Sequence, residues 1–348
     1  MIVIRPVREA DLDAIERLAG QAGPGMTNFP AERDLLAGKV AASLKSFARA
    51  ELPEDEREET FYWFVAEDVD TGAVVGCTGV MGAVGVTRPF YSYRLVNLPH
   101  SSLELHRYDI YTTLQMVNEY RGAAEIGTLY LEPDWRRDRN GRLLSRCRFL
   151  FMAEFRDRFS DLVMAELRGV QDERGRSVFW EGLGRHFFDM DFSKADYMSA
   201  IGNFQFIADL MPKHPVYVCL LPESAQAVLG IAHEHSRPAL ELLRREGFRF
   251  EGCVDVFDAG PTVHCPIDEV RTVRESFVAR IAAIADAPGG GEYMAATRDL
   301  PGFRLARGAV ECTAPGEVTI AAALAEVLGA AIGDTLRLAP FGRPAPGA

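Results

Sequence analysis

The segment from Glu125 to Met152 carries the clearest candidate for chemistry, because six arginines crowd the stretch from Arg136 to Arg148. A strand-forming run precedes them, Pro133 ends that run, and apolar residues recur at helical spacing from Leu143 onward. The first N–H groups of such a helix lack internal partners, and the helix dipole is positive at that end. The loop from Arg136 to Gly141 is therefore predicted to bind a diphosphate.

Within this loop, Arg136, Arg139 and Asn140 supply polar side chains, and Gly141 lets the backbone approach a ligand closely. The sequence contains no glycine–lysine phosphate loop and no dinucleotide-binding glycine fingerprint after a strand. This combination favours an acyl-CoA as the ligand. The simpler interpretation is that the arginines solvate a helix face at an ordinary strand, loop and helix junction.

The composition fits a globular chain with two or three small cores, since 48% of its 348 residues are hydrophobic. The net charge of −12 argues against nonspecific nucleic-acid binding, which needs cationic side chains to neutralise phosphates. The same charge favours the approach of a cationic substrate. The arginine cluster stands out against this acidic background.

The six cysteines form no Cys-x-x-Cys pair, which predicts neither a metal site nor a disulfide framework and fits reduced thiols in a cytoplasm. The N-terminus lacks the apolar core of a signal peptide, and no run of about 18 apolar residues could span a bilayer. We therefore expect a cytoplasmic protein with no metal, no membrane partner and no permanently bound cofactor.

Strands and helices must hold the arginine-rich loop in place. Residues 62–67 and 74–86 flank a turn and predict an antiparallel hairpin. The strand at 126–131, the helix at 142–157 and the strand at 162–170 leave room for a right-handed crossover and a parallel pair. The predicted fold class is α+β, with a mixed sheet flanked by helices.

Later segments give weaker predictions. Residues 177–188 and 239–250 both predict a short helix, a glycine and an aromatic strand. This similarity indicates either a weak internal repeat or the common order of helix, glycine and strand. An alanine-rich helix is expected near 281–287. Strands are expected within 297–312, 317–320 and 335–338.

The order of these elements resembles the fold of GCN5-related N-acetyltransferases, which use acyl-CoA. Longer blocks resemble the arginine N-succinyltransferase family and cover most of the first 265 residues. They include GPGMTNFP at 23–30, TLYLEPDWR at 128–136, NGRLLSRCRFLFMAEFRDRF at 140–159, FWEGLGRHFFDMDFSKADY at 179–197 and VDVFDAGPT at 254–262. The resemblance implies an acyltransferase-like core over 1–192, its continuation over 193–265 as a possible second acyltransferase-like half, and a small β-rich module over 266–348.

The resemblance also implies a reaction, the transfer of succinyl from succinyl-CoA to the α-amino group of L-arginine in arginine catabolism. The family's catalytic histidine falls on His233, and its residue associated with succinyl-CoA falls on Leu129. His233 then donates a proton to the departing thiolate or removes the ammonium proton through water. A backbone N–H near Leu129 is expected to stabilise the oxyanion.

Arg168 is the candidate for binding the succinyl carboxylate, because a guanidinium fork matches a carboxylate. A structural pair with Glu166 or Asp172 is the alternative. The 50 Asp and Glu residues leave the partners of the substrate guanidinium open. Two functions compete with this one. The chain could transfer succinyl to ornithine or another basic amino acid, or it could be a non-catalytic partner subunit. The resemblance implies a homo-oligomer or pairing with a paralogous subunit.

One departure from the family pattern concerns the loop itself. The usual pattern resembles Trp-Arg-x-x-Gly-Asn-Gly, and Arg139 stands here in place of the first glycine. If position 139 needs a positive φ, an arginine there costs roughly 1–2 kcal/mol. Alternatively, the Arg139 side chain points at the phosphates and offsets that strain.

Overall fold

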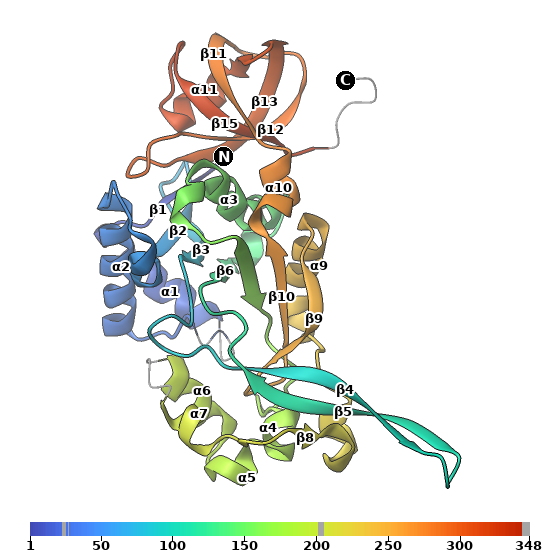
Figure 1. Cartoon of the computed structure of the whole chain (residues 1–348). Helices are drawn as coiled ribbons and strands as arrows, with labels where there is room; N and C mark the ends of the chain where they lie inside the picture. The colour runs from blue at the N-terminus through green and yellow to red at the C-terminus, as the bar shows by residue number, and fades with distance from the viewer. Residues whose placement is uncertain (23–25, 27, 201–204, 343–348) are drawn as a thin grey trace.

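The structure is a computed structural model that describes residues 1–22, 26, 28–200 and 205–342, so part of the 23–30 block lies outside the described residues. Its central sheet has the strand order β1–β2–β3–β6–β7–β10–β9 (Figure 1). The strands are β1 (Ile2–Pro6), β2 (Phe61–Asp68), β3 (Val74–Met81), β6 (Ala124–Leu131), β7 (Leu162–Glu166), β9 (Arg249–Asp255) and β10 (Pro261–Pro266). Neighbours are antiparallel except for β6 and β7, which are parallel as predicted.

Helices cover both faces of this sheet, which confirms the α+β prediction. Strand β2 shows this alternation. Tyr62 and Phe64 contact Phe151 of α3 (Asn140–Glu154) and belong to the cluster that also includes residues of α9 (Arg237–Glu246). Trp63 and Val65 belong to a separate cluster with residues of α1 (Leu12–Ala22) and α2 (Arg33–Ala48). Successive side chains of a strand point to opposite faces, so an unbroken apolar run marks a strand that is buried on both sides.

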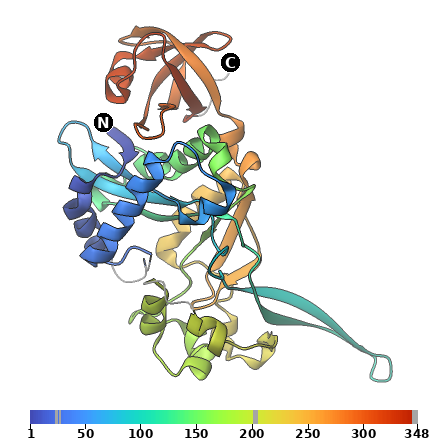
Figure 2. The ribbon, with the colours of Figure 1, turned by 60° about the vertical axis from the view of Figure 1, so that its left-hand side comes forward.

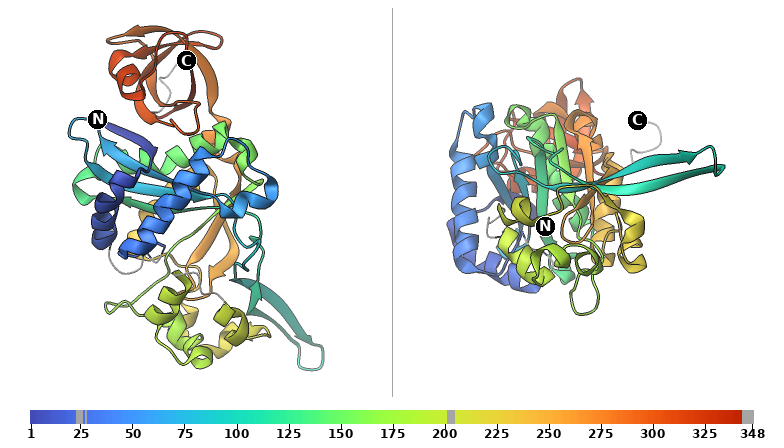
Figure 3. Two further views of the ribbon diagram at one scale, coloured as in Figure 1. Left: turned by 90° about the vertical axis from the view of Figure 1, so that its left-hand side faces the viewer. Right: turned by 60° about the horizontal axis from the view of Figure 1, so that its bottom comes forward.

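Two insertions extend the sheet. The first is the hairpin of β4 (Ser92–Ser102) and β5 (Arg107–Val117), a segment left open in the sequence analysis, which projects away from the body in every view (Figures 2 and 3). The second lies between β7 and α9 and contains α4 (Val178–Gly182), α5 (Arg185–Phe188), α6 (Phe192–Ala200), α7 (Gln205–Leu210) and α8 (Glu223–Gln226). Its own apolar core includes Phe179, Trp180 and Phe257.

The C-terminal barrel, residues 277–341, lies at the opposite end of the molecule from that helical insertion (Figures 1 and 3). Its strands are β11 (Phe277–Ala285), β12 (Gly291–Ala296), β13 (Leu305–Ala314), β14 (Glu317–Ala321) and β15 (Thr335–Pro340), and α11 (Ala322–Leu328) packs against them. The order β12–β15–β11–β14–β13 closes through pairing of β12 with β13. Ile4 of β1 pairs with Leu305 of β13, which joins the barrel to the central sheet.

Two local predictions were wrong. The alanine-rich helix expected near 281–287 is the strand β11, because pairing with β14 and β15 outweighs the intrinsic helix preference of alanine. The aromatic strand expected after Gly184 is the helix α5, since Gly184 itself has right-handed helical backbone angles. Phe188 then stacks on Trp180, with 5.1 Å between the ring centroids.

A buried ionic network connects helices α3, α9 and α10 (Arg271–Arg274). The Arg146 guanidinium is 3.1 Å from Glu246 and donates to the Thr272 hydroxyl at 2.7 Å. Glu246 also accepts from the Thr272 amide at 2.8 Å. Arg146 and Glu246 are each 2% exposed. Removing one member therefore leaves an uncompensated charge in the interior.

We expect Glu246→Ala to lower the free energy of unfolding by about 3–5 kcal/mol, because Arg146 would stay buried without its carboxylate. Urea denaturation measures this change. The matched control is Glu241→Ala on the same helix, which breaks the exposed pair with Arg244 and should cost no more than about 1 kcal/mol. Equal effects of the two substitutions would contradict the role given to the buried network.

Candidate active site

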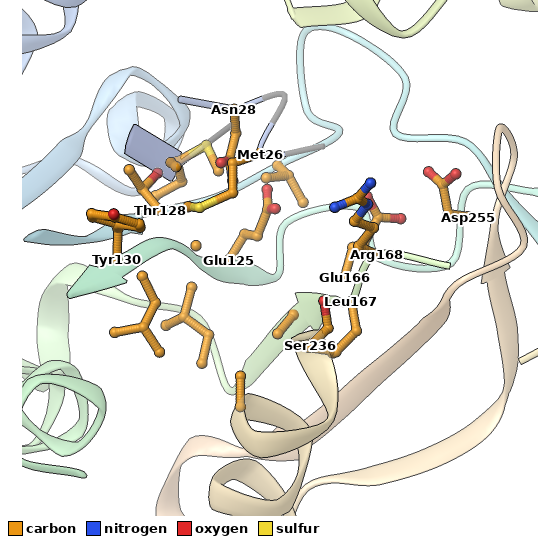
Figure 4. A pocket seen from close by; sticks show the side chains of 18 of the residues that line it. Met26, Asn28, Glu125, Thr128, Tyr130, Glu166, Leu167, Arg168, Ser236 and Asp255 are labelled. Atoms are coloured by element: carbon orange, nitrogen blue, oxygen red, sulfur yellow. The ribbon is translucent and has the colours of Figure 1, made fainter. Parts of the chain in front are cut away.

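The site begins where β6 and β7 separate. The two strands pair only through Ala124 with Val163 and Glu125 with Met164. Beyond these pairs they diverge, which exposes the edge of β6 to a cavity of about 1740 Å³. The cavity extends from the arginine-rich loop, past β6, to the ends of β7 and β9 (Figure 4). All four loop residues predicted to bind phosphate, Arg136, Arg139, Asn140 and Gly141, line it.

The loop holds its shape through its own polar contacts. The Asn140 side chain donates to the carbonyl of Trp135 at 3.2 Å, and Arg136 Nε donates to the carbonyl of Leu131 at 2.9 Å. A Cβ on Gly141 would have only one neighbour within 4 Å, a Leu131 methyl at 3.9 Å. The space in front of Gly141 is therefore open, and a ligand can approach the first turn of α3 closely.

Arg139 has a positive φ, which the sequence analysis considered as one possibility. Its φ is 59° and its ψ is 20°, and it is the N-cap residue of α3. Asp138 before it also has a positive φ of 51°. Such a conformation costs an L-residue roughly 1–2 kcal/mol. The Arg139 guanidinium forms an ion pair with Glu292 of the C-terminal barrel at 2.6 Å. Its charge is thus already paired with a carboxylate.

Leu129 lies beside an irregularity in β6. The register with β3 shifts between Gly79, which pairs with Gly127, and Cys77, which pairs with Tyr130. Thr128 and Leu129 thus oppose a single residue of β3, and Thr128 has a positive φ of 52°. This is a β-bulge, a feature that re-aims backbone groups. The Leu129 side chain packs against the main core.

The structure brings His233 and Arg168 together, although they lie 65 positions apart in the chain. Gly169 and Ala232 form a β-bridge, and the His233 amide donates to the Arg168 carbonyl at 2.8 Å. Arg168 lines the cavity, its guanidinium contacts Gln171, and its buried Nε has no hydrogen-bond partner among the described residues.

His233 is half-buried at the start of the segment that leads into α9. Its Nδ1 accepts from the His235 amide at 3.2 Å. Burial and then the Arg168 charge lower the pKa of His233, which favours the neutral imidazole. The residues that follow it, Glu234, His235 and Ser236, line the cavity, whereas His233 is not among the described residues that line it. His235 is a second imidazole, with its ring centroid 5.0 Å from that of His233.

Four carboxylates line the cavity beyond the bulge, and the sequence analysis named only one of them, Glu166, as a possible partner of Arg168. They are Glu125, Glu166, Asp255 and Asp258. Figure 4 shows Glu125, Glu166 and Asp255 along one side, with Arg168 beside Glu166. Burial, and then the charges of Asp255, Glu125 and Asp258, raise the pKa of Glu166 well above its usual range. We call these four residues the acidic wall.

Backbone groups support part of the acidic wall. Asp258 accepts from the amides of Gly169 at 2.7 Å and Gly260 at 2.8 Å, and Asp255 accepts from the amide of Phe257 at 2.7 Å. Glu125 is only 9% exposed and forms no hydrogen bond or salt bridge with another side chain of the described residues. Burial raises the pKa of Glu125 to about 7, while the charge of Lys39 opposes the shift.

The signal that marks these acids in the sequence is a lone carboxylate inside an apolar strand, as in Glu125 before Ile126 or Glu166 after Ala165. Such residues are rarely buried without a reason. The described residues hold no group of three or more His, Cys, Asp or Glu side chains that could bind a metal ion. Within the same part of the chain, no helix is long and apolar enough to cross a membrane.

The family model described as arginine N-succinyltransferase beta subunit matches residues 2–272. The chain belongs to the arginine N-succinyltransferase family. The prediction of this family, and of an acyltransferase, is thereby confirmed. A relative named arginine N-succinyltransferase from Citrobacter koseri is 47% identical over 289 residues, which is 83% of each chain. Another relative of that name, from Enterobacter sp. (strain 638), is 44% identical over 340 residues, 97% of each chain.

A solved structure shares the whole fold. It is arginine/ornithine succinyltransferase subunit AI from Pseudomonas aeruginosa, which is 31% identical and superposes with a TM-score of 0.87. The match covers 98% of this chain and 99% of that chain. The fold described above, including the C-terminal barrel, is therefore that of this family.

Glu125→Gln should remove a pH-dependent loss of stability. The pKa of Glu125 in the folded protein, about 7, lies above its ordinary value of about 4.3. Its contribution to the free energy of unfolding is therefore fully present below pH 4 and is lost as the pH rises through 7. Between pH 5 and 8 the wild-type protein should lose about 2–3 kcal/mol relative to the variant. Urea denaturation at both pH values measures the difference. Parallel pH profiles would contradict the raised pKa, and the exposed Glu241→Gln serves as the control.

Proposed function

We propose that this chain is an arginine N-succinyltransferase, which transfers succinyl from succinyl-CoA to the α-amino group of L-arginine. The observation that carries the proposal is the pairing of two opposite charges in one cavity of a member of this family. The arginine-rich loop lies at one end, and the acidic wall lies at the other. The first suits an anionic carrier, and the second suits a cationic acceptor.

The coenzyme is proposed to bind along the opening between β6 and β7. Its diphosphate would contact the first N–H groups of α3, where Asn140 and Gly141 line the cavity. Its acyl arm would follow the unpaired edge of β6 toward Thr128 and Leu129, since an unpaired strand edge offers N–H and C=O groups to an extended ligand. This path brings the thioester to the bulge.

The acceptor is proposed to bind against the acidic wall. A bound guanidinium would relieve the mutual repulsion of Glu166, Asp255 and Asp258, which is one cause of the raised pKa of Glu166. A guanidinium can also form two parallel N–H···O bonds with one carboxylate. Arg168 remains our candidate for the succinyl carboxylate, because its Nε is a buried donor with no hydrogen-bond partner among the described residues.

The reaction forms an amide and breaks a thioester. The α-ammonium of arginine first loses a proton, and Glu125, with its pKa of about 7, is suited to accept it near neutral pH. The neutral amine attacks the thioester carbon, and the oxygen gains negative charge. A backbone N–H at the Thr128–Leu129 bulge is proposed to stabilise this charge. The intermediate then expels CoA as a thiolate.

His233 is proposed to protonate that thiolate. Because its Nδ1 accepts from the His235 amide, the neutral ring carries its proton on Nε2. The ring must gain a proton before it can act, because only the imidazolium form is acidic enough to protonate a thiolate. The lowered pKa makes that imidazolium a stronger acid, and the ring is left as neutral imidazole after the transfer. Solvent would return the proton to the imidazole.

Ornithine is the second candidate acceptor, because the structural relative from Pseudomonas aeruginosa is named an arginine/ornithine succinyltransferase. The acidic wall would attract either cation. A planar guanidinium matches carboxylates in two-point contact, whereas an ammonium interacts as a point charge. We therefore favour arginine. A non-catalytic partner subunit is the remaining alternative from the sequence, and turnover by the purified chain alone would exclude it.

A substrate panel tests the function directly. Purified protein with succinyl-CoA should release free thiol with L-arginine, less with L-ornithine, and at least about 30-fold less efficiently with L-citrulline, which has the shape of arginine without its charge. Mass spectrometry should identify N-succinylarginine as the product. A preference for ornithine would change the acceptor, and equal rates with citrulline would remove the acidic wall from substrate recognition. Acetyl-CoA in place of succinyl-CoA tests the choice of acyl group.

His233→Ala should lower kcat by about 10²-fold or more while leaving the Kd of CoA nearly unchanged, because the imidazole acts on the leaving group. His235→Ala is the matched control, since this neighbouring ring itself lines the cavity and is largely exposed. Its kcat should fall by less than about threefold. A larger loss in His235→Ala than in His233→Ala would assign the proton donor to the other ring.

A further inference from the structure

The C-terminal barrel lies along helix α3, the helix that carries the arginine-rich loop (Figure 1). At the C-terminal end of α3, Glu154 forms ion pairs with Arg298 at 2.8 Å and with Arg337 at 2.7 Å. Further along, Arg146 donates to the carbonyl of Pro340 at 2.9 Å. The barrel therefore contacts α3 along its length, outside the cavity.

A third set of contacts reaches the loop itself. Glu292 of β12 accepts from Arg139 at 2.6 Å through one oxygen and from Arg307 at 2.9 Å through the other. The buried ring of Phe341 lies against the same arginines, with Cζ of Arg139 at 5.2 Å and of Arg307 at 5.5 Å from its centroid. The Phe341 amide donates to the Glu292 carbonyl at 2.8 Å, so these two residues are fixed relative to each other.

The backbone at position 139 matters because Arg139 is the N-cap of α3. Its φ and ψ set the direction in which the first N–H groups of the helix point, and those groups face the cavity. Arginine does not favour a positive φ, so its surroundings must select this conformation. The ion pair with Glu292 and the contact with Phe341 are the side-chain interactions that do so, and both come from the barrel.

We propose that the C-terminal barrel is a positioning element for the coenzyme site, in which Glu292 holds Arg139 in its left-handed conformation and so keeps the loop shaped for the CoA diphosphate. This inference rests on the proposed function. Glu292 acts through Arg139, and it does not line the cavity. The barrel therefore contributes to coenzyme affinity without touching the acceptor.

The test is a double-mutant cycle on coenzyme affinity, with unacylated CoA as the probe in titration calorimetry on the full chain. Glu292→Ala should raise the Kd of CoA about tenfold and the KM of succinyl-CoA by a similar factor, while the KM of arginine and the kcat at saturating succinyl-CoA change less than twofold. Glu317→Ala is the matched control, because Glu317 also pairs with an arginine on a barrel strand, Arg280, and makes no hydrogen bond or ion pair with α3 among the described residues. It should leave all four values unchanged.

The second arm of the cycle uses Arg139→Gly, since glycine adopts a positive φ without help from a side-chain contact. Whatever Kd this variant has, adding Glu292→Ala to it should change the Kd less than twofold. An equal effect of Glu292→Ala in both backgrounds would show that Glu292 does not act through Arg139 and would overturn the inference. An unchanged Kd in the single Glu292→Ala variant would overturn it as well.

Two checks keep the outcome interpretable. Thermal unfolding shows whether Glu292→Ala folds, and Glu292→Gln, which keeps the side-chain size, is measured in the same cycle and should also weaken CoA binding. If wild-type protein binds no CoA, the proposed function fails and this inference fails with it. If wild-type protein binds CoA normally and neither Glu292 variant changes the Kd, only the inference fails.

Discussion

The separation of β6 from β7 is the constraint on which the rest of this structure depends. Parallel strands normally satisfy each other's backbone groups along their length, and these two do so for only two residue pairs. An unpaired edge inside a protein needs another partner. Here that edge opens onto a large cavity, and the bulge at Thr128 turns the backbone further toward it. A long carrier that can replace the missing strand fits this opening.

The charges around the opening divide it by function. Helix α3 presents the positive end of its dipole and several arginines to one side, whereas Glu125, Glu166 and Asp255 line the other. Burying carboxylates together is unfavourable, as the raised pKa values of Glu125 and Glu166 show. A fold keeps such a cluster when a cationic ligand relieves it.

The two ends of the cavity depend on different parts of the chain. The helical insertion between β7 and α9 contributes Phe192 and Ile207 to the lining of the cavity, which also includes the acidic wall, the proposed acceptor site. The C-terminal barrel contacts α3 from outside, at the proposed coenzyme end. The acyltransferase core thus carries two extensions, the helical insertion and the C-terminal barrel, and each has a different structural role. The insertion shapes a pocket, and the barrel restrains a helix.

The sequence by itself determined the family, the mixed sheet, the parallel pair at β6 and β7 and the loop at the start of α3, because apolar periodicity and turn residues act locally. It also left position 139 as a choice between strain and a phosphate contact. Only the tertiary structure shows that Arg139 has a positive φ and pairs with Glu292, which lies 153 positions away in the chain. The sequence likewise did not reveal the acidic wall, because its members come from β6, β7, β9 and the β9–β10 turn. Pairing with neighbouring strands is also what makes β11 a strand. Local patterns specify helices and strands. The grouping of the acidic side chains and the pairing of the alanine-rich strand β11 arise only when distant segments pack together.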